Sequence, residues 1–419
     1  MLIEKLDRWY KFIQKRDYLK IKIKKINDLK GWTLNNFEVC NDKKYFFNIS
    51  FFKVNIGKNT IFTPLICQKE TGILGIIKSK INLVDKYLLQ AKTEPGNVNK
   101  IQISPTVQAT KSNYTRKHNG KITPYLNFFL KKKKRSKLIT KIYQMEQGTR
   151  YKKKYNQNIL IEVEDYKNIK IKDNFRWFSK NEIFELLKEK NLLNMDTLSI
   201  FSCSIKKKKI DKSLLSLSEI NKILKKYKKE KLYRIKKINL NNLNNWIVKF
   251  GKIFNKKENF FSIIGINVKT NSREIDTWDQ PIIKDNNIGF IGLITKEFYS
   301  NIHYLLKIVQ EPGYDFPVLT TTINSKNIIS KKTSEAKFFS HFENKKNVIF
   351  DQVLSDEGGR FFHNQNRNVV IKMSLKKFSK PKHNYIWVSH NQLVDLIKNK
   401  AISIELRNLF ACLNIQNIK

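Results

Sequence analysis

The sequence has few of the residues that build covalent or metal-held frameworks. Its four cysteines are scattered, with no CxxC pair, and this spacing argues against a zinc site and against a disulfide framework. The six histidines form no HxH or HExxH pattern, so we expect no dedicated metal site. No window reaches the roughly 18 consecutive apolar residues of a membrane span, and the start lacks the apolar core of a signal peptide. We therefore expect a cytoplasmic protein.

Acidic residues are scarce relative to basic ones. The 36 Asp and Glu face 82 Lys and Arg, which leaves a formal net charge of +46, and such an excess suggests a nucleic-acid partner. Only 11 of the basic residues are Arg, although Arg is favoured for bidentate phosphate and base contacts. The lysines, including the runs Lys131 to Lys134 and Lys206 to Lys209, are spread along the chain. We interpret them as a solvated surface, with a basic nucleic-acid-binding protein as the alternative.

An internal repeat is the strongest pattern that is present. Residues 64–96 match residues 281–313 without a gap, because a Pro, a Gly-x-x-Gly pair, a Tyr-Leu-Leu and a Glu-Pro-Gly recur at a constant separation of 217 residues. Such self-similarity indicates two copies of one unit. We place the first copy at residues 1–203 and the second at residues 214–419, joined by a Lys-rich linker at residues 204–213.

Further matches extend the repeat and predict its fold. Residues 146–151 align with 356–361, and each copy ends in a Trp followed by a helix capping box, Ser179 to Glu182 in one and Ser389 to Gln392 in the other. Short β-branched or aromatic segments bounded by turn residues predict strands. These strands are expected at residues 44–56, 71–79, 86–93, 138–145 and 158–164. Each half is therefore predicted to be an α+β unit, a mostly antiparallel sheet with helices.

The Glu-Pro-Gly turns carry the clearest chemical signal. Pro95 restricts Glu94 to extended geometry, so the carboxylate is held at a strand end, and Glu311 is its counterpart in the second copy. Hydroxyl and amide side chains, which suit sugar hydroxyls and phosphate oxygens, surround the first turn. The candidate binding residues there are Gln90, Thr106, Gln108, Ser112, Asn113 and Tyr114. The alternative is a structural turn beside a polar loop.

Long segments of the chain resemble the NDP-hexose 2,3-dehydratases of deoxysugar biosynthesis. The family's QAKxEPGN and SPTVQATxSNYT patterns are similar to residues 90–97 and 104–115. Its Trp-x-Gln-Pro-Ile-Ile block resembles residues 278–283, and its EGGRF and NR patterns resemble residues 357–361 and 366–368. The resemblance covers nearly the whole chain.

The resemblance implies duplicated Nudix-like α+β units and a homodimer. It also implies removal of water from a dTDP-4-keto-6-deoxyhexose to give a 3,4-diketo-2,6-dideoxy sugar, an unstable product that a downstream 3-ketoreductase would consume. The reaction needs neither a redox cofactor nor a metal, so we expect no cofactor. No Nudix box with clustered glutamates is present, and metal-dependent pyrophosphate hydrolysis is not expected. A catalytically impaired sugar-nucleotide binder is the alternative.

The candidate catalytic residues follow from this chemistry. Glu94 is predicted to be the base, with Lys92 two residues back on the same strand face as the cation that stabilises the enolate. Glu311 has Val309 in place of that Lys, and Glu357 is the next candidate base.

The remaining candidates concern the nucleotide. Arg150, Arg360 and Arg367 are expected to bind the diphosphate, and Tyr114 and Trp278 are candidates for stacking on thymine, although core packing is the better expectation for Trp278. Gln280 and Asn368 complete the set. The second copy departs from the pattern at the loop Thr320 to Ser325, which lacks the SPTVQ motif.

Overall fold

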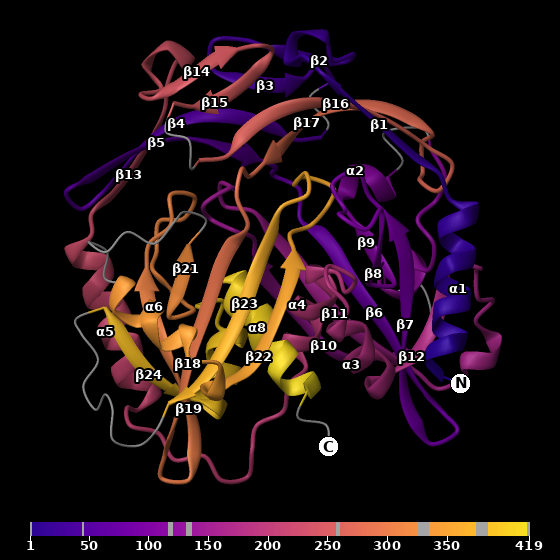
Figure 1. Ribbon diagram of the computed structural model, residues 1–419, viewed down its shortest axis with the longest axis vertical. Helices are drawn as coiled ribbons and strands as arrows, with labels where there is room; N and C mark the ends of the chain where they lie inside the picture. Colours follow the sequence, from indigo (N-terminus) through magenta and orange to yellow (C-terminus); the bar gives the residue numbers. More distant parts are fainter. Residues whose placement is uncertain are drawn as a thin grey trace.

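The computed structural model describes residues 2–43, 46–115, 120–130, 136–256, 260–325, 335–373 and 384–416. The fold is α+β, with mostly antiparallel sheets and few helices (Figure 1). Two large sheets lie side by side with helices between them, and two smaller sheets lie across the top of the molecule in Figure 1. The start of the first expected strand, at Lys44, and the run Lys131 to Lys134 lie outside the described residues.

Each large sheet has seven strands. In the first half the order is β10 (Ser136–Met145), β11 (Tyr155–Val163), β6 (Gly72–Ile81), β7 (Val84–Thr93) and β12 (Phe175–Ser179), with β8 (Ile101–Ser104) on β7 and β9 (Val107–Ala109) on β6. In the second half it is β22 (Val348–Ser355), β23 (Gln365–Met373), β18 (Gly289–Phe298), β19 (Asn301–Val309) and β24 (Tyr385–Ser389), with β20 (Val318–Thr320) on β19 and β21 (Ile323–Ser325) on β18.

The two large sheets therefore have the same strand order. Four of the five strands that the sequence predicted lie in the first of them, and the fifth, predicted at residues 44–56, is β4 (Asn48–Ile56) in a small sheet. The central pairs β11–β6 and β23–β18 are parallel, and the other pairs are antiparallel. The central strands carry nearly continuous apolar runs because they are covered on both faces.

The two small sheets contain strands from both halves. One is built from β2 (Trp32–Leu34), β3 (Glu38–Asn41), β4 (Asn48–Ile56), β5 (Asn59–Cys67) and β13 (Tyr233–Lys237); the other is built from β14 (Trp246–Lys249), β15 (Lys252–Asn255), β16 (Ser262–Thr270), β17 (Thr277–Lys284) and β1 (Leu19–Lys24). The first strand of each half thus pairs with the opposite half, β1 with β16 and β13 with β4. This reciprocal exchange joins the halves through backbone hydrogen bonds.

The helices are α1 (Leu2–Arg16), α2 (Lys111–Tyr114), α3 (Lys180–Lys188), α4 (Met195–Cys203), α5 (Leu217–Glu230), α6 (Ala336–Glu343), α7 (His390–Lys398) and α8 (Ile404–Gln416). The capping boxes predicted at the starts of α3 and α7 are both formed, with Ser179 and Ser389 accepting hydrogen bonds from the backbone N–H three residues on. No helix among the described residues is long and apolar enough to cross a membrane.

The core lies between the two large sheets, where α4 and α8 pack together (Figure 1). Both helices are buried nearly all round, as their apolar sequences require. Leu198 of α4 and Phe410 of α8 belong to one continuous apolar cluster that also includes residues from both sheets. The halves therefore share a core.

The Glu-Pro-Gly turns form a second connection between the halves. The backbone N–H of Gly96 donates to the carbonyl oxygen of Gly358 at 2.7 Å, and that of Gly313 donates to Gly148 at 2.7 Å. Each turn of one half thus lies against the Gly-containing loop of the other. Glycine is required because backbone approaches backbone without room for a side chain.

We expect Gly96→Ala and Gly313→Ala to destabilise the protein. A Cβ at Gly96 would lie 1.7 Å from the carbonyl oxygen of Phe361, and one at Gly313 would lie 1.8 Å from that of Tyr151. Overpacking of this kind costs about 1–3 kcal/mol or more, so each variant should have a lower Tm in thermal unfolding. Leu83→Ala, at a hairpin tip that is 94% exposed, is the control and should change Tm little. Tm values like wild type for both glycine variants would contradict the close contact.

Candidate active site

Each Glu-Pro-Gly turn packs against a loop of the opposite half, and each of these two contacts forms one site. We call the residues around Glu94 the first site and those around Glu311 the second site. In the first, the end of β7 meets the loop after β22 that contains Glu357. In the second, the end of β19 meets the loop after β10, where the N–H of Gly148 donates to Glu311 Oε2 at 2.8 Å. Both halves contribute to each site.

Glu94 is held by two cations. It is 2% exposed, and its Oε1 lies 2.9 Å from Lys92 Nζ and 3.2 Å from a guanidinium nitrogen of Arg273. Its Oε2 is buried and has no hydrogen-bond partner among the described residues. Burial alone would raise the pKa of Glu94, but the charges of Lys92 and Arg273 outweigh it and keep the pKa below its ordinary value. One oxygen of an ionised carboxylate is thus left for a ligand.

A chain of hydrogen bonds orients Lys92. Its Nζ donates to Gln108 Oε1 at 2.7 Å, and Gln108 Nε2 donates to Asp196 Oδ2 at 2.7 Å. Asp196 lies in the first turn of α4, where its N–H donates to the capping side chain of Asn194. Burial, followed by the charges of nearby carboxylates, raises the pKa of Asp196 well above its usual range.

Glu357 is a partly buried carboxyl group of a different kind. Its Oε1 accepts a hydrogen bond from the N–H of Gly359 at 2.8 Å. Burial, reinforced by the charge of Glu94, raises the pKa of Glu357 to about 7. The first site therefore contains one carboxylate that stays ionised and one that exchanges its proton near neutral pH.

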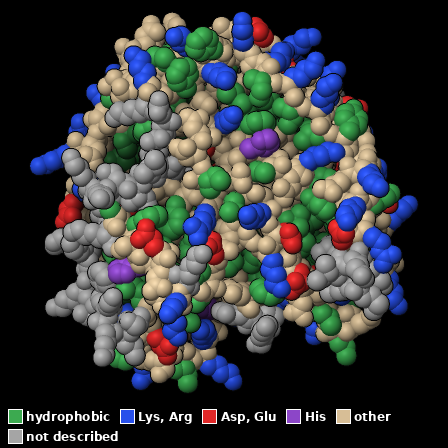
Figure 2. Space-filling view, viewed as in Figure 1, with side chains coloured by type: hydrophobic (Ala, Val, Ile, Leu, Met, Phe, Trp, Pro, Cys, Tyr) green, Lys and Arg blue, Asp and Glu red, His purple; other side chains and the backbone are tan. Residues whose placement is uncertain are grey.

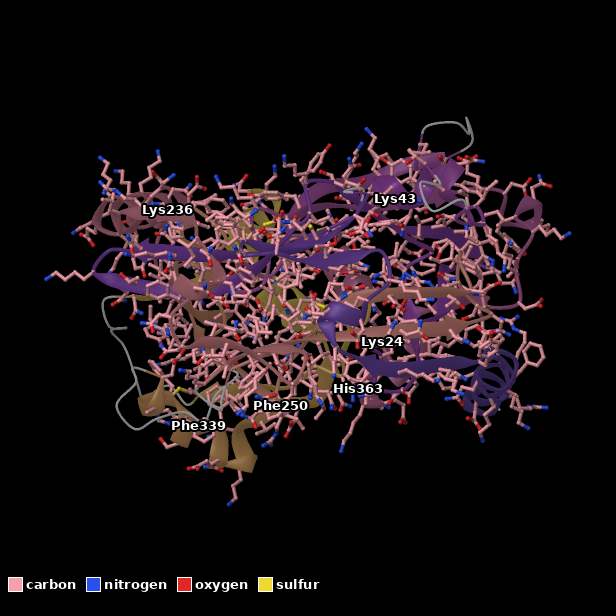
Figure 3. All side chains as sticks on the ribbon, turned by 90° about the horizontal axis from the view of Figure 1, so that it is seen from above. Lys24, Lys43, Lys236, Phe250, Phe339 and His363 are labelled. Carbon is pink, nitrogen blue, oxygen red and sulfur yellow. The ribbon has the colours of Figure 1, made fainter. Side chains whose placement is uncertain are left out.

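A large cavity opens beside these groups. A small pocket of about 110 Å³ contains Glu94 and Glu357, and a neighbouring cavity of about 880 Å³ shares Asn113, Arg273 and Arg360 with it. The large cavity is lined by four aromatic side chains, Trp32, Phe46, Phe47 and Trp278, and by six basic ones against two acidic ones. Lys24, one of its basic residues, lies near the middle of the molecule seen from above (Figure 3). The cavity suits an anionic ligand with a flat ring.

Arg360 and Gln280 belong to the wall between the two spaces. The guanidinium of Arg360 lies 4.0 Å from the ring centre of Phe47, and its buried Nε has no hydrogen-bond partner among the described residues. Gln280 Nε2 donates to the carbonyl oxygen of Gly359 at 2.8 Å, while its Oε1 accepts from Trp278 Nε1. Trp278 therefore lines the cavity and also packs, partly buried, against the apolar cluster of β16 and β17.

The second site lacks the lysine that pairs with the Glu-Pro-Gly carboxylate in the first site. Val309 stands where the first site has Lys92, and Glu311 is left in a pocket of about 340 Å³ with Glu405. Burial, followed by the charge of Glu405, raises the pKa of Glu311 to about 8. Arg150 lines this pocket but is paired with Asp285 at 3.0 Å. The same Glu-Pro-Gly turn thus holds a charged carboxylate in one half and a carboxylic acid in the other.

Several residues predicted from the sequence have structural contacts. The hydroxyl of Thr106 accepts from the N–H of Ile77 and donates to the carbonyl oxygen of Leu88, and Ser112 is bound to Glu70. Thr322 repeats the contacts of Thr106 in the second half, which supports a role in holding the sheet. We do not carry Thr106 or Ser112 into the proposed site.

Other predicted residues lie away from both sites. Arg367 forms a two-pronged ion pair with Asp351 on a half-exposed strand face, and Asn368 donates to the backbone of Asn366. Tyr114 packs against the apolar cluster beside β9, and Gln90 is half-buried on β7. None of the four is among the described residues that line the two sites. Arg367 has a carboxylate partner already, so we assign it no diphosphate contact.

Sequence reasoning missed Arg273, Glu274, Asp196, Glu146 and Lys154. Arg273 and Glu274 lie at residues 271–276, in the loop between β16 and β17, outside the repeated blocks. Asp196 lies in the first turn of α4, and Glu146 begins the repeated block of residues 146–151. Burial lowers the pKa of Lys154 to about 8. Among the described residues, no group of three or more His, Cys, Asp and Glu side chains is arranged to hold a metal ion.

Comparison with known proteins identifies relatives along the whole chain. The family profile described as NDP-hexose 2,3-dehydratase matches residues 3–204 and 217–413. A protein named dTDP-4-dehydro-6-deoxy-alpha-D-glucopyranose 2,3-dehydratase from Streptomyces violaceoruber is 30% identical over 407 residues, 92% of this chain and 91% of that protein. One of the same name from Saccharopolyspora spinosa is 29% identical over 380 residues, covering 84% and 78%.

Solved structures give a weaker likeness. A crystal structure of an ADP compounds hydrolase shares 16% identity and covers 37% of this chain and 84% of that chain, with a TM-score of 0.23. No conclusion is drawn from so low a score.

The two Glu-Pro-Gly carboxyl groups should affect stability with opposite signs. Glu311 has a raised pKa, so its ionisation opposes folding increasingly as pH rises from its unfolded pKa of about 4.3 towards about 8. Glu311→Gln should therefore raise Tm at about pH 8 and leave it unchanged at about pH 4. Glu94 has a lowered pKa, so its ionised form stabilises the fold above the unfolded pKa. This stabilisation is lost as pH falls through the folded pKa. Glu94→Gln should therefore lower Tm at about pH 8. Shifts of the same sign at that pH would refute this electrostatic difference.

Proposed function

The chain belongs to the NDP-hexose 2,3-dehydratase family, and from this premise we propose that it removes water from a dTDP-4-keto-6-deoxyhexose. The C2 hydroxyl and the C3 proton leave, and the product is a 3,4-diketo-2,6-dideoxy sugar nucleotide. The observation that carries the proposal is the first site, where an ionised carboxylate and a carboxyl group with a raised pKa lie beside a basic, aromatic cavity.

The substrate dictates which groups are needed. Its C4 ketone acidifies the C3 proton, and its C2 hydroxyl is β to that carbonyl. A base removes the C3 proton, a cation or donor stabilises the enolate oxygen, and an acid protonates the departing hydroxyl. The resulting enol, with its double bond between C2 and C3, tautomerises to the 3,4-diketone.

The first site offers each of these groups. Environments that push two pKa values apart mark the base and the acid of a pair, so we assign Glu94 as the base and Glu357 as the acid. The partnerless Oε2 of Glu94 is the oxygen that takes the proton. Lys92 contributes two donors to Glu94 and Gln108, and the third hydrogen of its ammonium group can bond the enolate oxygen.

The large cavity is proposed to hold the nucleotide. Arg360 has a buried donor, Nε, with no partner among the described residues, and charge-assisted bonds to a diphosphate would satisfy it. The aromatic side chains, including Trp32 and Trp278, provide faces on which a thymine ring can stack. Asn113, at the boundary of cavity and pocket, is placed to contact the sugar.

The first site is proposed to be the catalytic one, because the second has Glu311 without the cations that keep Glu94 ionised. The retained Glu94, Lys92 and Glu357 favour an enzyme over an impaired binder. On the face seen in Figure 2, the described Lys and Arg side chains are spread and not gathered in one patch, which speaks against a nucleic-acid surface on this face.

We further propose that the two halves are copies of one Nudix-like unit. The support is the identical strand order of the two large sheets and the two stretches that match one family profile. A homodimer and a downstream 3-ketoreductase stay predictions from the family resemblance.

Glu94→Gln should abolish most of the turnover of the keto sugar. Loss of a positioned proton-transfer group costs roughly 10²-fold or more in kcat, whereas the affinity for dTDP, measured by calorimetry, should change little because Glu94 does not line the large cavity. Glu311→Gln is the matched control, since it alters the same turn in the other half, and its kcat should fall much less.

Three outcomes would count against this assignment. A larger loss in Glu311→Gln would move the chemistry to the second site. Wild-type turnover in both variants would make the turns structural. Tight, salt-resistant DNA binding by a protein that neither binds dTDP nor converts the keto sugar would favour the nucleic-acid alternative.

The pH dependence should reveal Glu357. An acid must be protonated to act, so kcat/KM for the wild type should fall as pH rises through about 7, the pKa of Glu357. Glu357→Gln should be slower and lack this limb. Lys154, whose pKa is about 8, lines the same pocket, and Lys154→Met should keep this fall in kcat/KM. A rate that instead rises through about pH 7 would make Glu357 the base.

A further inference from the structure

Arg273 lies between the small pocket and the large cavity of the first site. It lies in the loop 271–276 of the second half, and one of its guanidinium nitrogens reaches the carbonyl oxygen of Thr93 at 3.1 Å as well as Glu94 Oε1 at 3.2 Å. Its Nε lies 3.2 Å from Glu274. The side chain lines both the small pocket with the carboxyl groups and the large basic cavity. A ligand in either space can therefore contact it.

The second site shows the effect of leaving such an arginine out. The equivalent hairpin of the first half, β4–β5, turns through Gly57 and Lys58 alone, and no basic residue of that hairpin is among the described residues lining the second site. Glu311 is then protonated at neutral pH, whereas Glu94 is ionised. The longer loop that carries Arg273 thus distinguishes the two sites, together with Lys92.

Two cations on one carboxylate create a difficulty for catalysis. They keep Glu94 ionised, but they also lower its affinity for a proton, and a general base works best when its pKa lies near the operating pH. A base that gains strength only after the substrate binds would avoid this conflict.

We propose that Arg273 is a positioning residue that couples the two spaces: the diphosphate of the substrate, bound in the large cavity, draws its guanidinium away from Glu94 and leaves that carboxylate paired with Lys92 alone. The inference rests on the proposed function. Glu94 then becomes a stronger base only in the complex with substrate.

The local structure favours movement of Arg273 over movement of Lys92. Lys92 extends from the sheet strand β7 and is bound to Gln108, whereas Arg273 extends from a loop. The backbone of that loop is anchored on both sides, by Asn271, which bonds Tyr18 and Arg16, and by Glu274, whose carbonyl oxygen accepts from Lys121. The side chain can therefore swing while its backbone stays in place.

Other charges act on Glu94 in either state. Glu94 faces Lys92 on its own strand, Glu357 from the opposite loop, Asp196 from α4 and Glu274 beside Arg273. Among the described residues, Arg273 is the cation that both contacts Glu94 and lines the large cavity, whereas Lys92 contacts Glu94 but does not line that cavity. A negatively charged ligand would affect Glu94 through Arg273 in particular.

The test compares pH profiles of turnover. The acidic limb of kcat/KM reports Glu94 in the free enzyme, and that of kcat reports it in the complex. In the wild type, the acidic limb of kcat should lie at higher pH than the acidic limb of kcat/KM. In Arg273→Met the kcat/KM limb should shift up to meet it, and KM should rise about tenfold or more because a charge-assisted bond to the diphosphate is lost. Arg273→Lys should restore part of the separation.

A second cation of the same cavity provides the control. Lys269 lines the large cavity, but no ion pair with Glu94 involves it. Lys269→Met should raise KM and keep the separation of the limbs. Coincident limbs in the wild type, or a separation that survives in Arg273→Met, would overturn the coupling while leaving the dehydratase activity established.

A binding experiment keeps the inference testable without turnover. dTDP-glucose carries the diphosphate but no C4 ketone, and its binding, measured by calorimetry in two buffers at about pH 5, should be accompanied by proton uptake. The uptake should decrease in Arg273→Met and in Glu94→Gln, and persist in Lys269→Met. Equal uptake in all four proteins would exclude the coupling. Failure of the wild type to convert the keto sugar would instead exclude the proposed function.

Discussion

The contact of each Glu-Pro-Gly turn with a backbone carbonyl of the opposite half is the constraint on which both sites depend. It brings the ends of β7 and β19 against loops that begin more than a hundred residues away in the chain. The exchanged strands β1 and β13, which pair with strands of the opposite half, also hold the two halves together. Because Glu94 comes from one half while Arg273 and Glu357 come from the other, neither half contains a complete site.

The two sites show that the Glu-Pro-Gly motif alone does not decide whether its carboxyl group is ionised. Glu94 and Glu311 occupy equivalent turns and are both buried, so desolvation acts on them alike. Their ionisation differs because Lys92 became Val309 and because only one hairpin is long enough to deliver an arginine. Two cations within about 3 Å outweigh burial; a single backbone N–H, the contact that Glu311 receives from Gly148, does not.

Local rules were enough to predict the strands, the capping boxes and the placement of Glu94 and Lys92 on one strand face, because each depends on residues close together in the sequence. The exchange of β1 and β13 was not predictable in this way, since strand propensity does not say which half a strand joins. Arg273 was missed for a similar reason: its loop lies outside the repeated blocks, and its partner is 179 residues away. Thr106 and Ser112 have side chains suited to a sugar, but Thr106 accepts a hydrogen bond from the sheet backbone and Ser112 donates one to Glu70.

Arg407 links the electrostatics of the two sites. This α8 residue is 1% exposed, and its guanidinium donates to the carbonyl oxygens of Ile402 and Met145. A buried charge is costly unless it is compensated; here Glu146, which lines the first site, and Glu405, which lines the second, supply opposite charge. The equivalent position in α4 is Leu198, fully buried. A second arginine there would add a buried cation without adding a carboxylate. Arg407 thus serves both sites, where its charge offsets part of the rise that burial causes in the pKa of Glu146 and of Glu311.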